Sequence, residues 1–159
     1  MGNKVEVKYE NTHFLEKKEK KIMLLCKKIF DILNINNWEL SIVICDDVFI
    51  RALNKEYRNI DEPTDVLSFS QLEDNFPFDY NKNVYAGDIV ISVDALERNS
   101  NEFKVEKNEE FIRLILHGIL HISGYTHSDN SSEQKMISYQ EEIIKKLTGV
   151  EIFKNEEIF

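Results

Sequence analysis

The chain contains few of the residues that mark specialised protein classes. Of its 159 residues, only two are cysteine, two are proline and five are glycine. Cys26 and Cys45 are too few, and too apolar in setting, for a disulfide framework or a zinc–thiolate site, and they fit a reducing cytoplasm. No apolar run approaches the ~20 residues that span a bilayer, and the first residues lack the apolar core of a signal peptide. We therefore expect a cytoplasmic globular protein without a membrane segment.

Positive charge is also in deficit, since the formal net charge is −9. The acidic excess is local: residues 61–110 carry 4 Lys or Arg against 13 Asp or Glu, whereas residues 1–60 carry 11 against 9. Because phosphates meet local patches rather than the net charge, RNA stays open as a partner. The lysine-rich face of a helix expected at about 15–33 has two interpretations, a solvated face or an RNA-binding one, and the solvated face is favoured.

Three of the four histidines lie close together, at positions 117, 121 and 127. His117 and His121 are four residues apart, so on a helix they project from the same face. Gly124 can end that helix in a left-handed residue and turn the chain back, which brings His127 toward the same point. Three neutral imidazoles hold a catalytic zinc and leave a fourth position open. Imidazole also suits nickel, copper and iron, so the identity of the metal is open.

The residue after the first histidine separates this pattern from that of the zinc proteases. Those enzymes require a glutamate directly after the first histidine as general base, and this chain has Gly118. The sequence therefore predicts a metal site without the base of a protease.

Apolar periodicity predicts a single domain over residues 1–159 in which four strands alternate with helices. Alternation marks strands near Val5, Trp38, Val66 and Ile89. Helices are expected at about 15–33, 47–57, 92–96, 108–123 and 132–147, with an acidic, frayed tail over 152–159. Asn108 and a Ser131–Gln134 capping box are predicted to start the last two helices, and Tyr57 and Ile137 to face inward.

Three blocks of the sequence then identify a family by resemblance. They are LNKEYRNIDEPTDVLSF (53–69), GDIVIS (87–92) and HGILHISGYTH (117–127). Their order and spacing strongly resemble the YbeY family of bacterial rRNA maturation factors, which are regarded as zinc-dependent endoribonucleases. The resemblance covers about residues 40–147. It departs at Thr126, where the family usually has an acidic residue before the last histidine.

The resemblance implies a fold, a site and a substrate. The implied fold is α+β, one domain with a mixed four-stranded sheet and packed helices, and the metal site lies on a central helix and the turn after it. The implied zinc ligands are His117, His121 and His127, with one Zn2+ per chain, and Arg58 is the basic residue of the active cleft. The implied role is single-strand-specific RNA cleavage in 16S rRNA 3′-end maturation and ribosome quality control. The implied partners are precursor rRNA, the small ribosomal subunit and its assembly proteins, with neither DNA nor a membrane expected.

Chemistry adds reasons for particular residues. Phosphodiester cleavage develops negative charge on phosphoryl oxygens, and the forked donors of Arg58 can stabilise it. The general base is open between zinc hydroxide, the 2′-hydroxyl of the RNA and a carboxylate, Asp65 or Asp88. A structural role is favoured for both aspartates, as turn formers or partners of a ligand histidine. Ser68 is a candidate contact to the substrate backbone, although a strand serine usually faces solvent.

Two alternative functions remain beside the nuclease. A ribosome assembly factor could use the metal only to hold the helix and turn together. A metallopeptidase-like zinc hydrolase is a third possibility, which Gly118 weakens.

Overall fold

The sheet forms from four stretches in which branched or aromatic side chains alternate with polar ones. In a computed structural model that describes residues 2–14, 16–72, 79, 81–125 and 130–148, they pair in the order β1-β2-β4-β3. The pairs β1–β2 and β2–β4 are parallel, and β3–β4 is antiparallel. This mixed four-stranded sheet confirms the expected α+β class. The strands are β1 (Lys4–Tyr9), β2 (Trp38–Cys45), β3 (Val66–Ser70) and β4 (Val84–Ser92).

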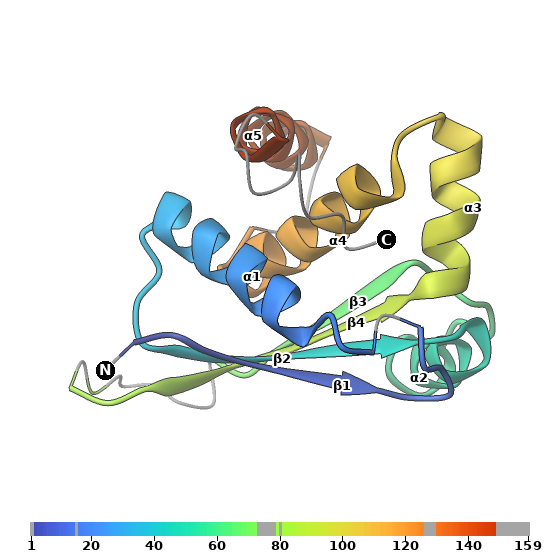
Figure 1. Ribbon diagram of the computed structural model, residues 1–159, viewed down its shortest axis with the longest axis horizontal. Helices are drawn as coiled ribbons and strands as arrows, with labels where there is room; N and C mark the ends of the chain where they lie inside the picture. The colour runs from blue at the N-terminus through green and yellow to red at the C-terminus, as the bar shows by residue number, and fades with distance from the viewer. Residues whose placement is uncertain (1, 15, 73–78, 80, 126–129, 149–159) are drawn as a thin grey trace.

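Five helices are seen in the described part of the chain, and most of them cover one face of the sheet. In Figure 1, α1 and α4 lie across the upper face, α5 lies over α4, and α2 packs against the opposite side. The predicted tail at 152–159 lies outside the described residues. The helices are α1 (Glu19–Leu33), α2 (Asp47–Arg58), α3 (Val93–Phe103), α4 (Lys107–Ile122) and α5 (Asn130–Thr148).

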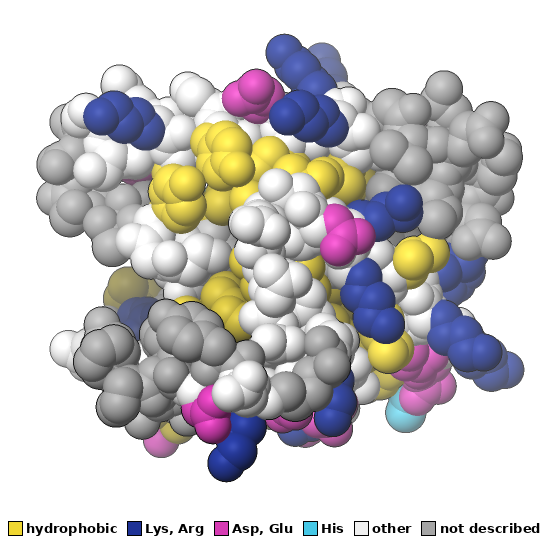
Figure 2. Space-filling model, turned by 90° about the vertical axis from the view of Figure 1, so that its left-hand side faces the viewer, with side chains coloured by type: hydrophobic (Ala, Val, Ile, Leu, Met, Phe, Trp, Pro, Cys, Tyr) yellow, Lys and Arg dark blue, Asp and Glu magenta, His cyan; other side chains and the backbone are white. Residues whose placement is uncertain are grey.

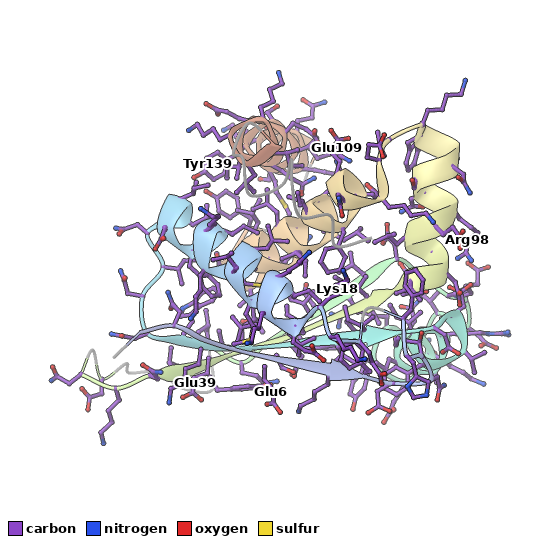
Figure 3. The ribbon with its side chains drawn as sticks, viewed as in Figure 1. Glu6, Lys18, Glu39, Arg98, Glu109 and Tyr139 are labelled. Atoms are coloured by element: carbon purple, nitrogen blue, oxygen red, sulfur yellow. The ribbon has the colours of Figure 1, made fainter. Side chains whose placement is uncertain are left out.

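The two faces of the sheet carry separate hydrophobic cores. The larger core joins alternate residues of β2 and β4 to α1, α4 and α5, and the smaller one joins their other residues to α2. Beyond α2, the lower face is polar, and Glu6 and Glu39 project from it in Figure 3. Because α4 contributes ten buried residues, it is the central helix of the larger core.

Several predicted boundaries are wrong by a few residues. Helix α1 begins at Glu19 rather than near residue 15, β4 begins at Val84, and α3 continues to Phe103. The N-cap position of α4 is Glu106, which makes no side-chain capping hydrogen bond, rather than Asn108, and Ser131 lies inside α5 rather than at a capping box. Tyr57 is 56% exposed and Ile137 is 43% exposed, so neither faces inward as predicted.

Three other helix ends have clear capping residues. Asn34 ends α1 in a left-handed conformation, with φ 55°. Asp46 and Ser92 cap α2 and α3, since their side chains accept from the backbone N–H groups of Phe49 and Ala95. Both of these helices begin directly after a strand, at the same end of the parallel pair β2–β4.

No helix in the described residues is long and apolar enough to cross a membrane. On the face shown in Figure 2, lysine and arginine side chains surround a group of exposed hydrophobic side chains. Cys26 and Cys45 are free and buried, as expected. Burial raises the pKa of both thiols, to about 12.

Candidate active site

Two of the predicted ligands face each other on α4. His117 and His121 are half-buried, and their Nε2 atoms are 3.1 Å apart, with ring centroids 4.5 Å apart. The spacing of four residues puts one ring a turn above the other on the same side of the helix. The structure therefore brings this pair together, with the nitrogen atoms opposed.

The separation of the two nitrogens fits metal coordination. Two nitrogen ligands of a tetrahedral zinc, each about 2.0–2.1 Å from the ion, lie roughly 3.3 Å apart. The third predicted ligand, His127, and the departure at Thr126 lie outside the described residues. Within the residues that are described, no group of three His, Cys, Asp or Glu side chains could hold a metal ion. The described geometry therefore supplies two donors of the expected set.

Helix α4 ends in a glycine turn directly after this pair. Gly124 has φ +109°, a conformation that L side chains rarely adopt, and its N–H donates to the carbonyl of His121. The N–H of Tyr125 then donates to the carbonyl of Leu120, which closes the last turn of the helix. The predicted glycine turn is thus present three residues after His121.

Gly118 sets how close α4 lies to the sheet. A Cβ atom at this position would come within 2.8 Å of Cδ1 of Ile89 on β4, with two further Ile89 atoms at 2.9 Å. Glycine is therefore required by packing at the position where the zinc proteases carry their base. Helix α4 is held close to β4 as a result.

Arg58 reaches the open edge of the sheet from the opposite side. Its Nη2 donates to the carbonyl oxygen of Ser68 at 3.0 Å, and its guanidinium lies 5.1 Å from the centre of the Phe69 ring. Tyr57 packs on the same ring, with centroids 5.2 Å apart, so this exposed side chain still makes an aromatic contact. Strand β3 is an edge strand that pairs with β4, so Arg58 is anchored at that edge.

The same strand connects Arg58 to the histidine side. Val66 packs in the core of α4 and lines a cavity with His117, and by strand alternation Ser68 lies on that same face. Ser68 thus presents its side chain on the histidine face while its carbonyl binds Arg58. Arg58 and the histidines lie around one edge strand, with no direct contact between them among the described interactions.

The two candidate aspartates occupy different sides of the sheet. Asp65 precedes β3 and lines the cavity beside His117; its oxygens accept from the N–H of Val66 and the side-chain amide of Asn99. Asp88 accepts a 2.6 Å hydrogen bond from the hydroxyl of Tyr85. It precedes Ile89, which faces α4, so alternation puts Asp88 on the opposite face. Only Asp65 is near the histidine pair.

Comparisons with known proteins identify the family of this chain. A family model described as Endoribonuclease YbeY matches residues 4–148. The chain belongs to the YbeY endoribonuclease family. It is 52% identical over 122 residues to the endoribonuclease YbeY of Treponema denticola, covering 77% of this chain and 79% of that one. Identity is 47% with the Treponema pallidum protein (73% and 72% covered) and 40% with that of Borrelia turicatae (77% and 81%).

A solved structure shares the fold of this YbeY family member. The solution structure of a Thermotoga maritima protein aligns with a TM-score of 0.58 at 26% identity, covering 91% of this chain and 89% of the other. The family resemblance inferred from the three sequence blocks is confirmed. The matched segment contains every site residue proposed from the sequence.

A charged network behind His117 was not predicted from the sequence. A cavity of about 420 Å³ between α3, α4 and α5 is lined by carboxylates and one arginine. Glu110 is 3% exposed, and its carboxylate accepts from Asn99 and Arg113 at 3.1 Å each. Burial raises the pKa of Glu110, although these two donors oppose the rise. A sequence signal existed, since Glu110 lies two turns before His117 on the same side of the helix, with Arg113 between them.

Proposed function

We propose that this YbeY family member is a zinc-dependent endoribonuclease whose metal is held by His117, His121 and His127. The observation that carries the proposal is the opposed pair of Nε2 atoms 3.1 Å apart on α4, close to the spacing of two zinc ligands. The glycine turn expected before His127 is present at Gly124, where φ is +109°. The endoribonuclease names of the relatives supply the substrate class, RNA.

Arg58 is the residue proposed to act on the phosphodiester. Its guanidinium is exposed and held at the β3 edge by Ser68 and Phe69, so its remaining donors can meet a phosphoryl oxygen. Bound zinc would supply a water with a pKa of about 7 and a Lewis acid for the phosphate. Asp65 is proposed to have a structural role, because both of its oxygens already accept hydrogen bonds. Ser68 is proposed as a contact to the substrate backbone, and Asp88 as a structural residue of β4.

The proposed substrate is single-stranded precursor rRNA at the 3′ end of 16S rRNA, cleaved in the cytoplasm with the small ribosomal subunit and its assembly proteins. We propose that residues 1–159 form a single catalytic domain. The packing of Gly118 against Ile89 argues against a metallopeptidase, because no side chain fits at the position of that enzyme's base. This contact neither favours nor opposes the alternative of an assembly factor without catalytic activity.

The test is cleavage of a 16S rRNA 3′-end fragment by four proteins purified in parallel. They are the wild type, His117→Ala, His121→Ala and His13→Ala. His13 is the matched control, because it is an exposed histidine paired with Glu16 on a different part of the chain. Discrete cleavage and about one zinc per chain are expected for the wild type and His13→Ala.

RNA cleavage and zinc binding should both be lost from the two α4 variants, while their circular dichroism spectra stay unchanged. Equal cleavage by all four proteins would identify a contaminating nuclease and remove the proposal. Retained zinc without cleavage in the wild type would favour the assembly factor.

A further inference from the structure

Helix α5 contacts the proposed ligand pair through a buried amide. Gln140 is 5% exposed, and its Oε1 lies 3.0 Å from Nδ1 of His117. The atom of the Gln140 amide that faces His117 is thus its oxygen, which can only accept a hydrogen bond.

This orientation decides the protonation of the imidazole. An amide oxygen accepts only, so Nδ1 of His117 carries the proton, and its Nε2 presents a lone pair toward His121. That tautomer is the one a metal bound at Nε2 requires. Metal-ligating histidines generally donate their other N–H to such a partner, which fixes the ring and raises ligand basicity.

An ion pair holds α5 at the position where this contact is made. Arg113 of α4 donates through Nε at 2.8 Å and Nη2 at 3.1 Å to the two oxygens of Glu141. The forked geometry fixes direction as well as distance. The Arg113 guanidinium, and then the Gln140 amide, hold the pKa of Glu141 below its usual value, so the pair is charged at neutral pH.

The residue before Gln140 contacts the turn that follows α4. Tyr139 stacks on Tyr125, with ring centroids 6.0 Å apart and an interplanar angle of 26°. Tyr125 directly follows Gly124, so α5 contacts both the first proposed ligand and the turn after α4 through consecutive residues. Figure 3 shows Tyr139 on the side of α5 near α1 and α4.

We propose that Gln140 is a positioning residue for the metal site: its side-chain oxygen fixes the tautomer and ring of His117, and the Arg113–Glu141 pair holds it there. This inference rests on the proposed function, because it concerns the same ligands. It assigns to α5 a role that goes beyond packing.

The test compares two substitutions that differ in hydrogen-bonding capacity. Gln140→Leu keeps approximate volume but cannot accept from His117, whereas Gln140→Glu retains an acceptor oxygen. Glu142→Gln, an exposed position on the same helix, is the matched control. Zinc affinity is measured by competition with a chromophoric chelator, and the His117 tautomer by ¹⁵N chemical shifts in the metal-free protein.

The leucine variant should bind zinc about 10–100-fold more weakly than the wild type and lose the Nδ1–H tautomer. The glutamate variant should bind within about threefold of the wild type or more tightly. Circular dichroism and urea unfolding establish that each variant is folded, and the glutamate variant keeps the comparison decisive if leucine destabilises α5.

The outcomes separate this inference from the proposed function. A wild type that binds no zinc removes the metal site itself. Zinc binding that is lost in His121→Ala but unchanged in Gln140→Leu overturns the positioning role and leaves the site standing. Equal weakening by leucine and glutamate assigns Gln140 to packing and also overturns it.

Discussion

Arg58 contributes charge at the edge of β3 without being buried, so its loss should affect catalysis more than stability. Arg58→Ala should lower kcat on RNA about 10²–10³-fold, because the fork that stabilises charge in the transition state is removed. Arg58→Lys should recover part of this, since it keeps the charge but not the planar fork. The free energy of unfolding should change by about 0.5 kcal/mol or less.

Single-turnover cleavage and urea unfolding measure the two effects. Arg51→Ala is the control, because Arg51 is an exposed arginine of the same helix that pairs with Asp61. An Arg58→Ala enzyme as fast as the control would remove Arg58 from the catalytic site.

Gly118 makes the closest contact between α4 and the sheet. Gly118→Ala should destabilise the protein by about 1–2 kcal/mol, since the clash with Ile89 exceeds the gain in helix propensity. Urea unfolding of Gly118→Ala, Ile89→Val and the double variant provides the measurement. A double variant more stable than the sum of the single effects is expected. Strict additivity would show that the two residues do not compete for the same space.

At the scale of single residues, the sequence predicts contacts between residues that are close together in the chain. The pairing of His117 with His121 follows from a spacing of four, and the turn at Gly124 follows from glycine chemistry. Gln140 was missed because its partner is 23 residues away on another helix. It nonetheless occupies the inward stripe of α5 with Met136, Ile143 and Leu147, and a polar residue on such a stripe marks a buried hydrogen bond.

Between elements, Asp47 links the starts of α2 and α3. Its carboxylate accepts from both terminal nitrogens of Arg98 and from the hydroxyl of Ser92. Arg98 first, and Ser92 as well, hold the pKa of Asp47 below its ordinary value of 3.8. The stabilisation is therefore complete above about pH 4 and is lost as the pH falls through the lower folded-state pKa.

Asp47→Asn should therefore cost about 1 kcal/mol at pH 7 and very little at pH 2. Urea unfolding at the two pH values checks this, with the exposed Asp31→Asn as control. An Asp47→Asn penalty that is the same at both pH values would show that ionisation of Asp47 does not stabilise the α2–α3 link.

Element boundaries were predicted less well than element types, for identifiable reasons. The start of β4 is hard to predict because glycine is typical of strand ends, whereas Gly87 lies inside the strand at a register shift. Between Glu39 and Leu40, the partners on β4 skip Ala86. A Cβ on Gly87 would lie 2.0 Å from the carbonyl oxygen of Phe69, so glycine is required by the close approach of β3.

For the whole molecule, metal binding and folding should be coupled. Zinc at 100 times its Kd adds about 2.7 kcal/mol to the free energy of unfolding. For a chain of this length that raises Tm by roughly 5–10 °C. A thermal scan with zinc and with chelator measures the difference, and His121→Ala should show little of it. An equal zinc response in His121→Ala would place the binding elsewhere.

The strand order could not be derived from periodicity, because alternation gives strands but not their neighbours. The mixed sheet was expected only through the family resemblance, and the placement of β4 between β2 and β3 comes from the structure. The location of Arg58 at the open edge of the sheet depends on that order, because β3 is the edge strand.

The same strand order has a consequence for synthesis on the ribosome. Strand β3 leaves the ribosome before β4, the only strand it pairs with in the described sheet, and His117 and His121 follow later still. Arg58 is therefore made early, but the strand that anchors it can join the sheet only after β4 has emerged. The site proposed for RNA cleavage is incomplete in a half-translated chain, which therefore cannot use it on the messenger or the ribosomal RNA around it.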